Sequence, residues 1–337
     1  MTRLLRSLIL ILSLFPSSIV FAENTGPVYL TLSESIKDFE LFASGGWDGN
    51  WYVGYNSMWI AKLEPPVQKK KWVRAYIGAR LGRMKSHSVD EKKPWVHEPN
   101  PCDIYMGLAS TPAWKSDNTY FLTSCEDLPL EGSPTDAVRG VGEAQWFWAE
   151  VPLSAVALAG PNYISIWSNT PELVQASSAP ILAATEVRGQ ITAWLNRGIQ
   201  GTPPTNPTEA LESNLSFFAP GIALKLIPEH VVTDVTVEMV DFQEKQGIYS
   251  WEIQVMAKNF DRAQAEISID GNAWNSFGRP MFHAPYRVVI SAQRIEQEAK
   301  RLVPGKRNLN EALLRITAVD EWGNKGSTQR FSVYINN

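Results

Sequence analysis

The sequence has few cysteines, few histidines and no long apolar segment beyond its first 22 residues. Its 337 residues include two Cys and four His, and no two His stand at the spacing of a helical metal site. No later run approaches the ~20 apolar residues that a membrane-spanning helix needs. Phosphate-binding glycine loops and the Gly-x-Ser-x-Gly nucleophile motif are also missing. These absences argue against zinc hydrolases, nucleotide-binding enzymes and proteins with transmembrane helices.

The first 22 residues have the pattern of a secretory signal peptide. Arg3 and Arg6 precede an apolar run from Leu8 to Phe15, and Val20-Phe21-Ala22 has small residues where a signal peptidase needs them. We expect cleavage after Ala22 and export to the periplasm or the extracellular space, with no transmembrane segment left after cleavage. The alternative, an uncleaved anchor, needs a longer apolar run.

Net charge is weak. The full chain holds 31 Lys and Arg against 35 Asp and Glu, a net charge of −4. Loss of two arginines with the signal peptide leaves 29 against 35, or −6. Because nucleic-acid binding depends on neutralising phosphates with basic side chains, we expect no nucleic-acid partner.

The two cysteines, Cys102 and Cys125, are expected to form a disulfide. Exported proteins fold in an oxidising compartment, where an even pair of cysteines close in sequence usually pairs. Such a bond stabilises a fold by roughly 3–4 kcal/mol in the chain-entropy model. The alternative is two free thiols.

Short β-rich runs separated by Gly, Asn and Pro dominate the rest of the chain. In the first part they are 28–32, 51–55, 58–63, 72–81, 103–108, 120–123, 145–151, 163–168, 181–185, 191–195 and 217–227. In the second part they are 235–237, 251–257, 265–269, 286–291, 313–319 and 329–335. Many short strands with turn signals between them predict an all-β fold of antiparallel sandwiches or barrels.

We place a domain boundary near Pro228, giving a first domain over 23–228 and a smaller one over 229–337. The linker-like run Gly201 to Pro207 is the alternative boundary. One helix is expected in the second domain, over 292–303. There Ile295, Ala299 and Leu302 recur at helical spacing, and Pro304-Gly305 follows.

The second domain resembles bacterial immunoglobulin-like or fibronectin type III-like domains. The resemblance lies in two segments, 314–327 (LRITAVDEWGNKGS) and 265–274 (AEISIDGNAW). They are similar to the A-x-D-x-x-G-N turn and the S-I-D-G-x-x-W hairpin of those domains. The resemblance covers about a hundred residues. It implies a sandwich that acts as a spacer or adhesion module, and says little about chemistry.

The first domain resembles jelly-roll carbohydrate-binding modules more loosely. The shared features are the Trp-rich opening 45–51 (GGWDGNW), the strand pair around 146–148 and 163–167, and a last strand that ends near Ile227. The resemblance implies a jelly-roll-like sandwich.

An aromatic set near the start of the first domain is the predicted ligand-binding site. Its members are Trp47, Trp51, Tyr52, Tyr55 and Trp59. Aromatic rings stack on the C–H faces of sugars, and their polar edges tolerate water. Alternation along a strand gives the competing interpretation, in which these rings fill the core.

No cofactor is expected apart from a possible structural calcium. Asp48 and Asn50 offer oxygen ligands of the kind that calcium prefers, although Asp, Asn and Gly are also the usual residues of turns. The stretch Asp320 to Asn324 has the same two interpretations.

We therefore expect an exported, non-catalytic protein that binds a glycan or another cell-envelope component through aromatic side chains, with no catalytic residue assigned. One alternative is a structural protein of the cell surface that binds other proteins. The other is a polysaccharide-active enzyme, which needs two carboxyl groups around one bond. Candidates for that pair are Asp48, Asp103, Glu143 and Glu150.

Overall fold

The structure is a computed structural model of the chain. It describes residues 26–40, 52–82, 86–88, 92, 97–99, 102–111, 118–128, 144–174, 179–187, 192–197, 218–229, 233–282, 284–304 and 311–334. The signal-peptide prediction, Trp47, Asp48, Asn50, Trp51 and Glu143 lie outside these residues. None of the described helices is both long and apolar enough to cross a membrane.

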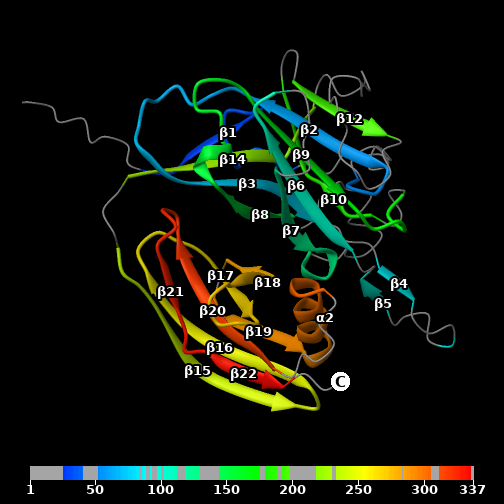
Figure 1. Cartoon of the computed structure of the whole chain (residues 1–337), viewed down its shortest axis with the longest axis vertical. Coiled ribbons are helices and arrows are strands. Elements are labelled where there is room, and N and C mark those ends of the chain that lie inside the picture. The colour runs from blue at the N-terminus through cyan, green and yellow to red at the C-terminus, as the bar shows by residue number, and fades with distance from the viewer. Residues whose placement is uncertain are drawn as a thin grey trace, which may run out of the picture.

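The first sandwich packs two antiparallel sheets against each other (Figure 1). One sheet has the order β1 (Val28–Thr31), β14 (Ile222–Pro228), β3 (Trp72–Gly82) and β10 (Ile181–Leu182), with β8 (Ala144–Val151) also paired to β3. The other has the order β12 (Ala193–Arg197), β2 (Ser57–Leu63), β9 (Asn162–Ser168), β6 (Asp103–Ala109) and β7 (Thr119–Ser124). Small pairs are β11 (Ala184–Glu186) with β13 (Phe218–Pro220), and β4 (Ser86–Ser88) with β5 (His97–Pro99).

Strand alternation fills the core between these two sheets. In β3, Ile77 and Leu81 point inward, and in β9, Ile164 and Ile166 do the same; all four are fully buried. The outer face of the second sheet is also apolar, where a separate cluster gathers around Met58, Ile60, Tyr163 and Trp167. Successive side chains of a strand point to opposite faces of the sheet. Because both sets are apolar here, this sheet is apolar on both faces.

The second sandwich is smaller and has its own core. One sheet has the order β15 (Val235–Lys245), β16 (Ile248–Ala257) and β19 (Tyr286–Ser291). The other has the order β18 (Asn275–Met281), β17 (Phe260–Ser268), β20 (Glu311–Asp320) and β21 (Lys325–Ser327), with β22 (Phe331–Tyr334) also paired to β20. Its largest fully buried side chains are Trp251 and Phe277. Pro228, near which the boundary is predicted, is the last residue of β14, and the first strand of the second sandwich begins at Val235.

The predicted helix is confirmed as α2 (Ala292–Leu302). Ser291 caps its start, because its side chain accepts a hydrogen bond from the Arg294 amide at 3.1 Å. Ile295 and Ala299 face the core, and the basic residues Lys300 and Arg301 in the last turn suit the negative end of the helix dipole.

Asp320–Asn324 forms a turn in which both oxygens of the Asp320 carboxylate accept hydrogen bonds. Asp320 Oδ1 accepts hydrogen bonds from the amides of Trp322 and Asn324, and Oδ2 accepts from Thr233 and from the Asn324 side chain. Gly323 has a φ of 78°, which favours glycine. The turn interpretation therefore holds here.

The two sandwiches touch along the open face of the β1–β14–β3–β8 sheet. Lys225 on β14 is buried there, with its Nζ 3.2 Å from the Asp261 carboxylate of β17 and 5.8 Å from the Trp148 ring. Arg74 donates a hydrogen bond to the Gly323 carbonyl of the β20–β21 turn. A cation on one sandwich and a carboxylate on the other thus fix the first of two contact regions.

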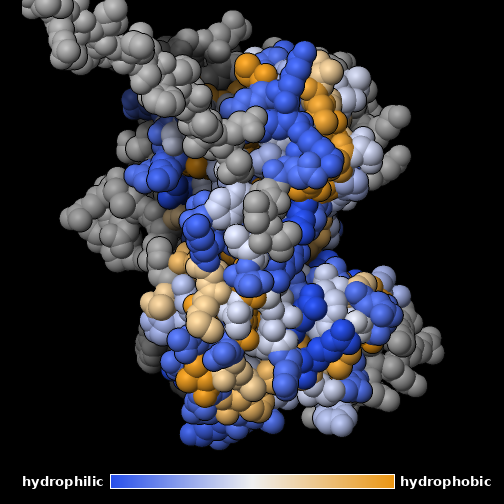
Figure 2. Space-filling model, turned by 90° about the vertical axis from the view of Figure 1, so that its left-hand side faces the viewer, coloured by the Kyte–Doolittle hydropathy of each residue, from blue (hydrophilic) through white to orange (hydrophobic). Residues whose placement is uncertain are grey.

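The face formed by the β15 side of the molecule mixes polar and apolar groups (Figure 2). Apolar side chains gather on its lower sandwich, where the edge strand β15 exposes Met239, Val240 and Phe242. Phe242 stacks on Phe331 with ring centroids 6.0 Å apart.

Candidate functional site

The second contact region is built on η3 (Cys125–Asp127), a single 3-10 turn after β7. The predicted disulfide between Cys102 and Cys125 is present, with Cα atoms 5.0 Å apart, and the Cys125 amide donates to the Cys102 carbonyl at 2.9 Å. These links hold the turn against the start of β6. They fix the direction in which Glu126 and Asp127 project from the first sandwich.

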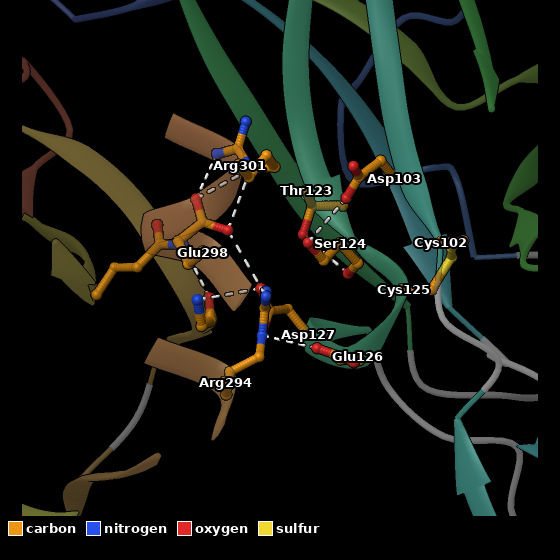
Figure 3. Close-up of polar contacts among 12 residues, drawn as sticks. Cys102, Asp103, Thr123, Ser124, Cys125, Glu126, Asp127, Arg294, Glu298 and Arg301 are labelled. Atoms are coloured by element: carbon orange, nitrogen blue, oxygen red, sulfur yellow. Dashed lines mark hydrogen bonds and ion pairs between the residues drawn. A yellow bond between two sulfur atoms is a disulfide. The ribbon is translucent and has the colours of Figure 1, made fainter. Parts of the chain in front are cut away.

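Arg294 of α2 is the centre of the polar cluster between the sandwiches (Figure 3). Its Nε lies 2.7 Å from Glu126 Oε2, and its Nη2 lies 3.2 Å from Asp127 Oδ2. Its Nη1 lies 3.6 Å from Glu298 Oε2, one helical turn away. Burial alone would lower the pKa of Arg294, but the three carboxylates outweigh burial and raise it. One guanidinium therefore joins both sandwiches.

Asp127 is almost fully buried, and its carboxylate also closes an edge of the second sandwich. Its Oδ2 accepts a hydrogen bond from the Gly278 amide of β18 at 3.0 Å. Since β18 is an edge strand, this amide has no ladder partner on that side. Burial raises the pKa of Asp127 to about 6, although the Arg294 charge opposes the shift.

Glu298 lies deeper in the same cluster and is 1% exposed. Arg301 pairs with it from the next turn of α2. The Arg301 guanidinium also lies 3.7 Å from the ring centroid of Phe121 on β7, which is a cation–π contact across the two sandwiches. Each of the three carboxylates therefore has an arginine partner, as buried charges require.

A cavity of about 740 Å³ opens beside this cluster. That volume is within the usual range of small-molecule sites. Its polar lining includes Arg279 of β18, Arg287 of β19, and Gln293 and Gln297, which lie one turn apart on α2; all four are exposed. Apolar groups of the lining include Ala265 of β17, Met281 of the edge strand β18, and Val288 and Ile290 of the edge strand β19. Polar planar side chains thus surround an apolar floor.

The carboxyl groups of the cavity do not form an acid–base pair. Among the described residues, Glu126 and Asp127 are the two that bring a carboxyl group to its lining; they are adjacent in sequence, and both bind Arg294. A glycosidase needs its two carboxyl groups on opposite sides of the bond that it cleaves. The arrangement can bind polar ligands but is not set up for that chemistry.

The structure corrects the predicted aromatic platform at two positions. Trp59 is 0% exposed and Tyr52 is 5% exposed, and the Trp59 indole donates a hydrogen bond to the Tyr52 carbonyl at 3.0 Å. Alternation along β2 turns Trp59 toward the core, so neither ring presents a face to a ligand. Tyr55 is half-buried, and Trp47 and Trp51 lie outside the described residues. An exposed role for these three rings stays a prediction.

The other predicted site residues are not brought together. Asp103 and Glu150 lie on different sheets of the first sandwich, so they share no cleft. Ser124 donates a hydrogen bond to Asp103, and Glu150 faces Lys325 at 3.7 Å. Within the described ranges, no group of three or more His, Cys, Asp or Glu is placed to hold a metal ion. The calcium prediction at Asp48 and Asn50 is outside those ranges.

Sequence reasoning missed the cluster around Arg294. It assigned no role to Glu126 or Asp127 and treated 292–303 as a plain amphipathic helix. Two signals were present in the sequence: an acidic pair directly after a cysteine, and Glu298 on the otherwise apolar face of the helix beside Ile295 and Ala299. A buried acidic residue on a helix indicates a partner cation.

Comparisons with known proteins show no family. No protein-family model matches the sequence, and no curated protein matches it. Among solved structures, a β-glucuronidase from Ruminococcus gnavus in complex with uronic deoxynojirimycin is 10% identical. It aligns over 94% of this chain and 46% of its own, with a TM-score of 0.25. A β-1,2-glucanase from Parabacteroides distasonis is also 10% identical, over 88% of this chain and 39% of its own, with a TM-score of 0.25. The chain spans less than half the length of these structures, and such TM-scores carry no argument about function.

Proposed function

We propose that this protein is an exported, non-catalytic carbohydrate-binding protein, and that its ligand enters the cavity between the two sandwiches. The observation that carries the proposal is the lining of that cavity. Exposed guanidinium and amide groups from β18, β19 and α2 stand around an apolar floor. A sugar needs such a combination, because its hydroxyls both donate and accept hydrogen bonds while its ring C–H groups are apolar.

The side-chain amides of Gln293 and Gln297 are the groups best placed to form hydrogen bonds with the hydroxyls of a sugar. Both lie on the same face of α2 and are exposed. Neither has a side-chain hydrogen bond to another described residue. Binding a ligand therefore breaks no hydrogen bond between these amides and the described residues, and each amide offers two donors and one acceptor oxygen.

The test is a binding assay on the chain from Glu23 onward with a broad polysaccharide panel, read by affinity electrophoresis and tryptophan fluorescence. We expect at least one ligand to bind, and the double substitution Gln293→Ala with Gln297→Ala to weaken binding about tenfold, the scale of a hydrogen bond or two. The matched control is Gln254→Ala, an exposed glutamine on β16 outside the cavity.

Three results contradict the proposal. Failure to bind any polysaccharide favours the alternative of a protein-binding surface module. Binding that the double substitution leaves unchanged moves the site elsewhere on the molecule. New reducing or unsaturated ends in the same incubations favour the polysaccharide-active alternative, which the arrangement of Glu126 and Asp127 around Arg294 does not support.

A further inference from the structure

Two arginines of the cavity lining have no acidic partner within the described part of the chain. Arg279 Nη2 donates to the Leu128 carbonyl at 2.8 Å, and Arg287 Nε donates to Ser250 Oγ at 3.1 Å. Both side chains are exposed, and among the described residues neither forms an ion pair. Each guanidinium has five N–H donors, so most of its donors stay available to a ligand.

The carboxylates of the lining, in contrast, already have partners. Glu126 and Asp127 are bound by Arg294, and the buried Glu298 is bound by Arg294 and Arg301. With every group ionised, four arginines face three carboxylates in the cavity and its cluster, a net charge of +1. The excess positive charge is concentrated on the edge strands β18 and β19.

We propose that the cavity selects an anionic sugar, a uronate, and that its carboxylate is bound by Arg279 and Arg287. The inference rests on the proposed function and adds the ligand class. Guanidinium groups match carboxylates through paired N–H donors. The sugar hydroxyls then face Gln293, Gln297 and Glu126, and the apolar floor receives the ring C–H groups.

The carboxylates of the lining limit the negative charge that a ligand can carry. A ligand with negative charge at both ends would bring one of them against Glu126 and Asp127, which costs energy through like-charge repulsion. A single carboxylate on a ring of hydroxyls avoids this repulsion. The cavity therefore favours one charge at one end of a sugar unit over a densely charged polyanion.

The experiment compares uronate oligosaccharides with the same oligosaccharides after carboxyl reduction, so that only the charge changes. The probes are oligomers of galacturonate, glucuronate and mannuronate, and a sulfated neutral oligosaccharide tests whether any anion suffices. Titration calorimetry on the full mature chain, above the pKa of Asp127, gives each Kd. We expect at least one uronate oligomer to bind about tenfold or more tighter than its reduced form.

Substitutions then assign the preference to the arginines. We expect Arg279→Gln and Arg287→Gln each to remove most of the preference, and Arg279→Lys to keep part of it. Arg330→Gln, an exposed arginine on the same sandwich outside the cavity, is the matched control. Because Arg279 and Arg287 are exposed, their loss should not prevent folding, which circular dichroism checks.

The outcomes separate this inference from the proposed function. Equal affinity for the acidic and reduced forms overturns the uronate selection and leaves carbohydrate binding intact. Tighter binding of the sulfated neutral sugar than of every uronate also overturns it. An acid preference that survives both glutamine substitutions places the carboxylate outside this cavity. Absence of binding to every probe and to the wider panel overturns the proposed function itself.

Discussion

At the scale of single residues, Asp127 is the group whose protonation affects the contact between the sandwiches most directly. It lies within the cluster of Glu126, Glu298 and Arg294 and accepts a hydrogen bond from the Gly278 amide. Burial raises its pKa from 3.8 to about 6. Because a raised folded-state pKa favours the protonated form, the folded state gains stability from Asp127 at low pH and loses it as pH rises toward 6.

The first prediction is a pH effect specific to Asp127. The stability contributed by this residue should be complete below pH 3.8 and should fall as pH rises through about 6. Asp127→Asn keeps an oxygen acceptor for Gly278 and does not titrate. The free energy of unfolding is measured by urea denaturation for wild type and Asp127→Asn across this range. As pH rises, the value for wild type should fall relative to the value for Asp127→Asn. A difference that stays constant with pH would contradict the expectation.

The second prediction concerns Arg294. Replacing it with methionine leaves the buried Glu298 and Asp127 carboxylates with less compensation, so we expect a loss of about 3–5 kcal/mol in unfolding free energy. The control Lys300→Met removes the exposed pair with Glu296 on the same helix, and it should cost less than about 1 kcal/mol. Similar losses for the two variants would show that Arg294 is not a central contact.

At the scale of elements, the disulfide determines how well η3 is held. It joins residues 23 apart in sequence and fixes the turn that carries Glu126 and Asp127. The bond therefore stabilises both the first sandwich and one wall of the cavity.

The third prediction is that Cys102→Ser with Cys125→Ser lowers the unfolding free energy by roughly 3–4 kcal/mol. Binding of the carbohydrate ligand should weaken as well, since Glu126 and Asp127 lose their anchor. A reducing agent should destabilise wild type to a similar extent and leave the double variant unchanged, which is measured by thermal unfolding with and without reductant. Insensitivity of the wild type to reductant in denaturant would argue against the bond.

Elements with regular alternation were predictable from sequence, and irregular edge strands were not. The runs that became β3, β8, β9 and β16, and the helix α2, show clear periodicity and match the structure closely. The strand β18 (NSFGRPM) was missed because Gly278 and Pro280 indicate a turn, yet an edge strand tolerates both. The run 51–55 was predicted as a strand, whereas within the described part only Tyr52 forms an isolated bridge.

The candidate site was harder to predict than the fold, for a physical reason. Its groups come from the consecutive elements β18, β19 and α2 and from η3, which lies far from them in sequence, since Asp127 and Gly278 are 151 residues apart. They meet only after both sandwiches have formed. Periodicity reports which side of one strand is apolar, and it does not show which edge of one domain faces another. Trp59 was included in the predicted ligand platform, and the structure shows instead the competing interpretation, in which its strand turns it into the core.

At the scale of the whole molecule, the exposed edge strand β15 is a risk for self-association. Met239, Val240 and Phe242 are 42%, 61% and 43% exposed on this edge. Unpaired edges with apolar side chains are templates for further strand pairing.

The fourth prediction is that Val240→Lys reduces aggregation at high protein concentration without affecting ligand binding. A lysine on an edge strand disfavours pairing with another copy, and Val240 lies at a register shift between β15 and β16 where no ladder pair is lost. Light scattering against concentration measures the effect, and Val67→Lys, an exposed valine on the other sandwich, is the control. Equal scattering from the two variants would contradict a role for this edge.

The short connection between the sandwiches has a consequence for how the contacts of Lys225 and Arg294 act together. Only the stretch from Glu229 to Asp234 separates β14 from β15. Such a tether holds the two docking surfaces at an effective concentration that reaches roughly the millimolar range. Contacts too weak to join separate chains therefore suffice to hold the two sandwiches together within one chain. If the chain is cut within this stretch, the halves should fail to reassociate at micromolar concentration, and any ligand that touches both sandwiches should then act as their crosslinker.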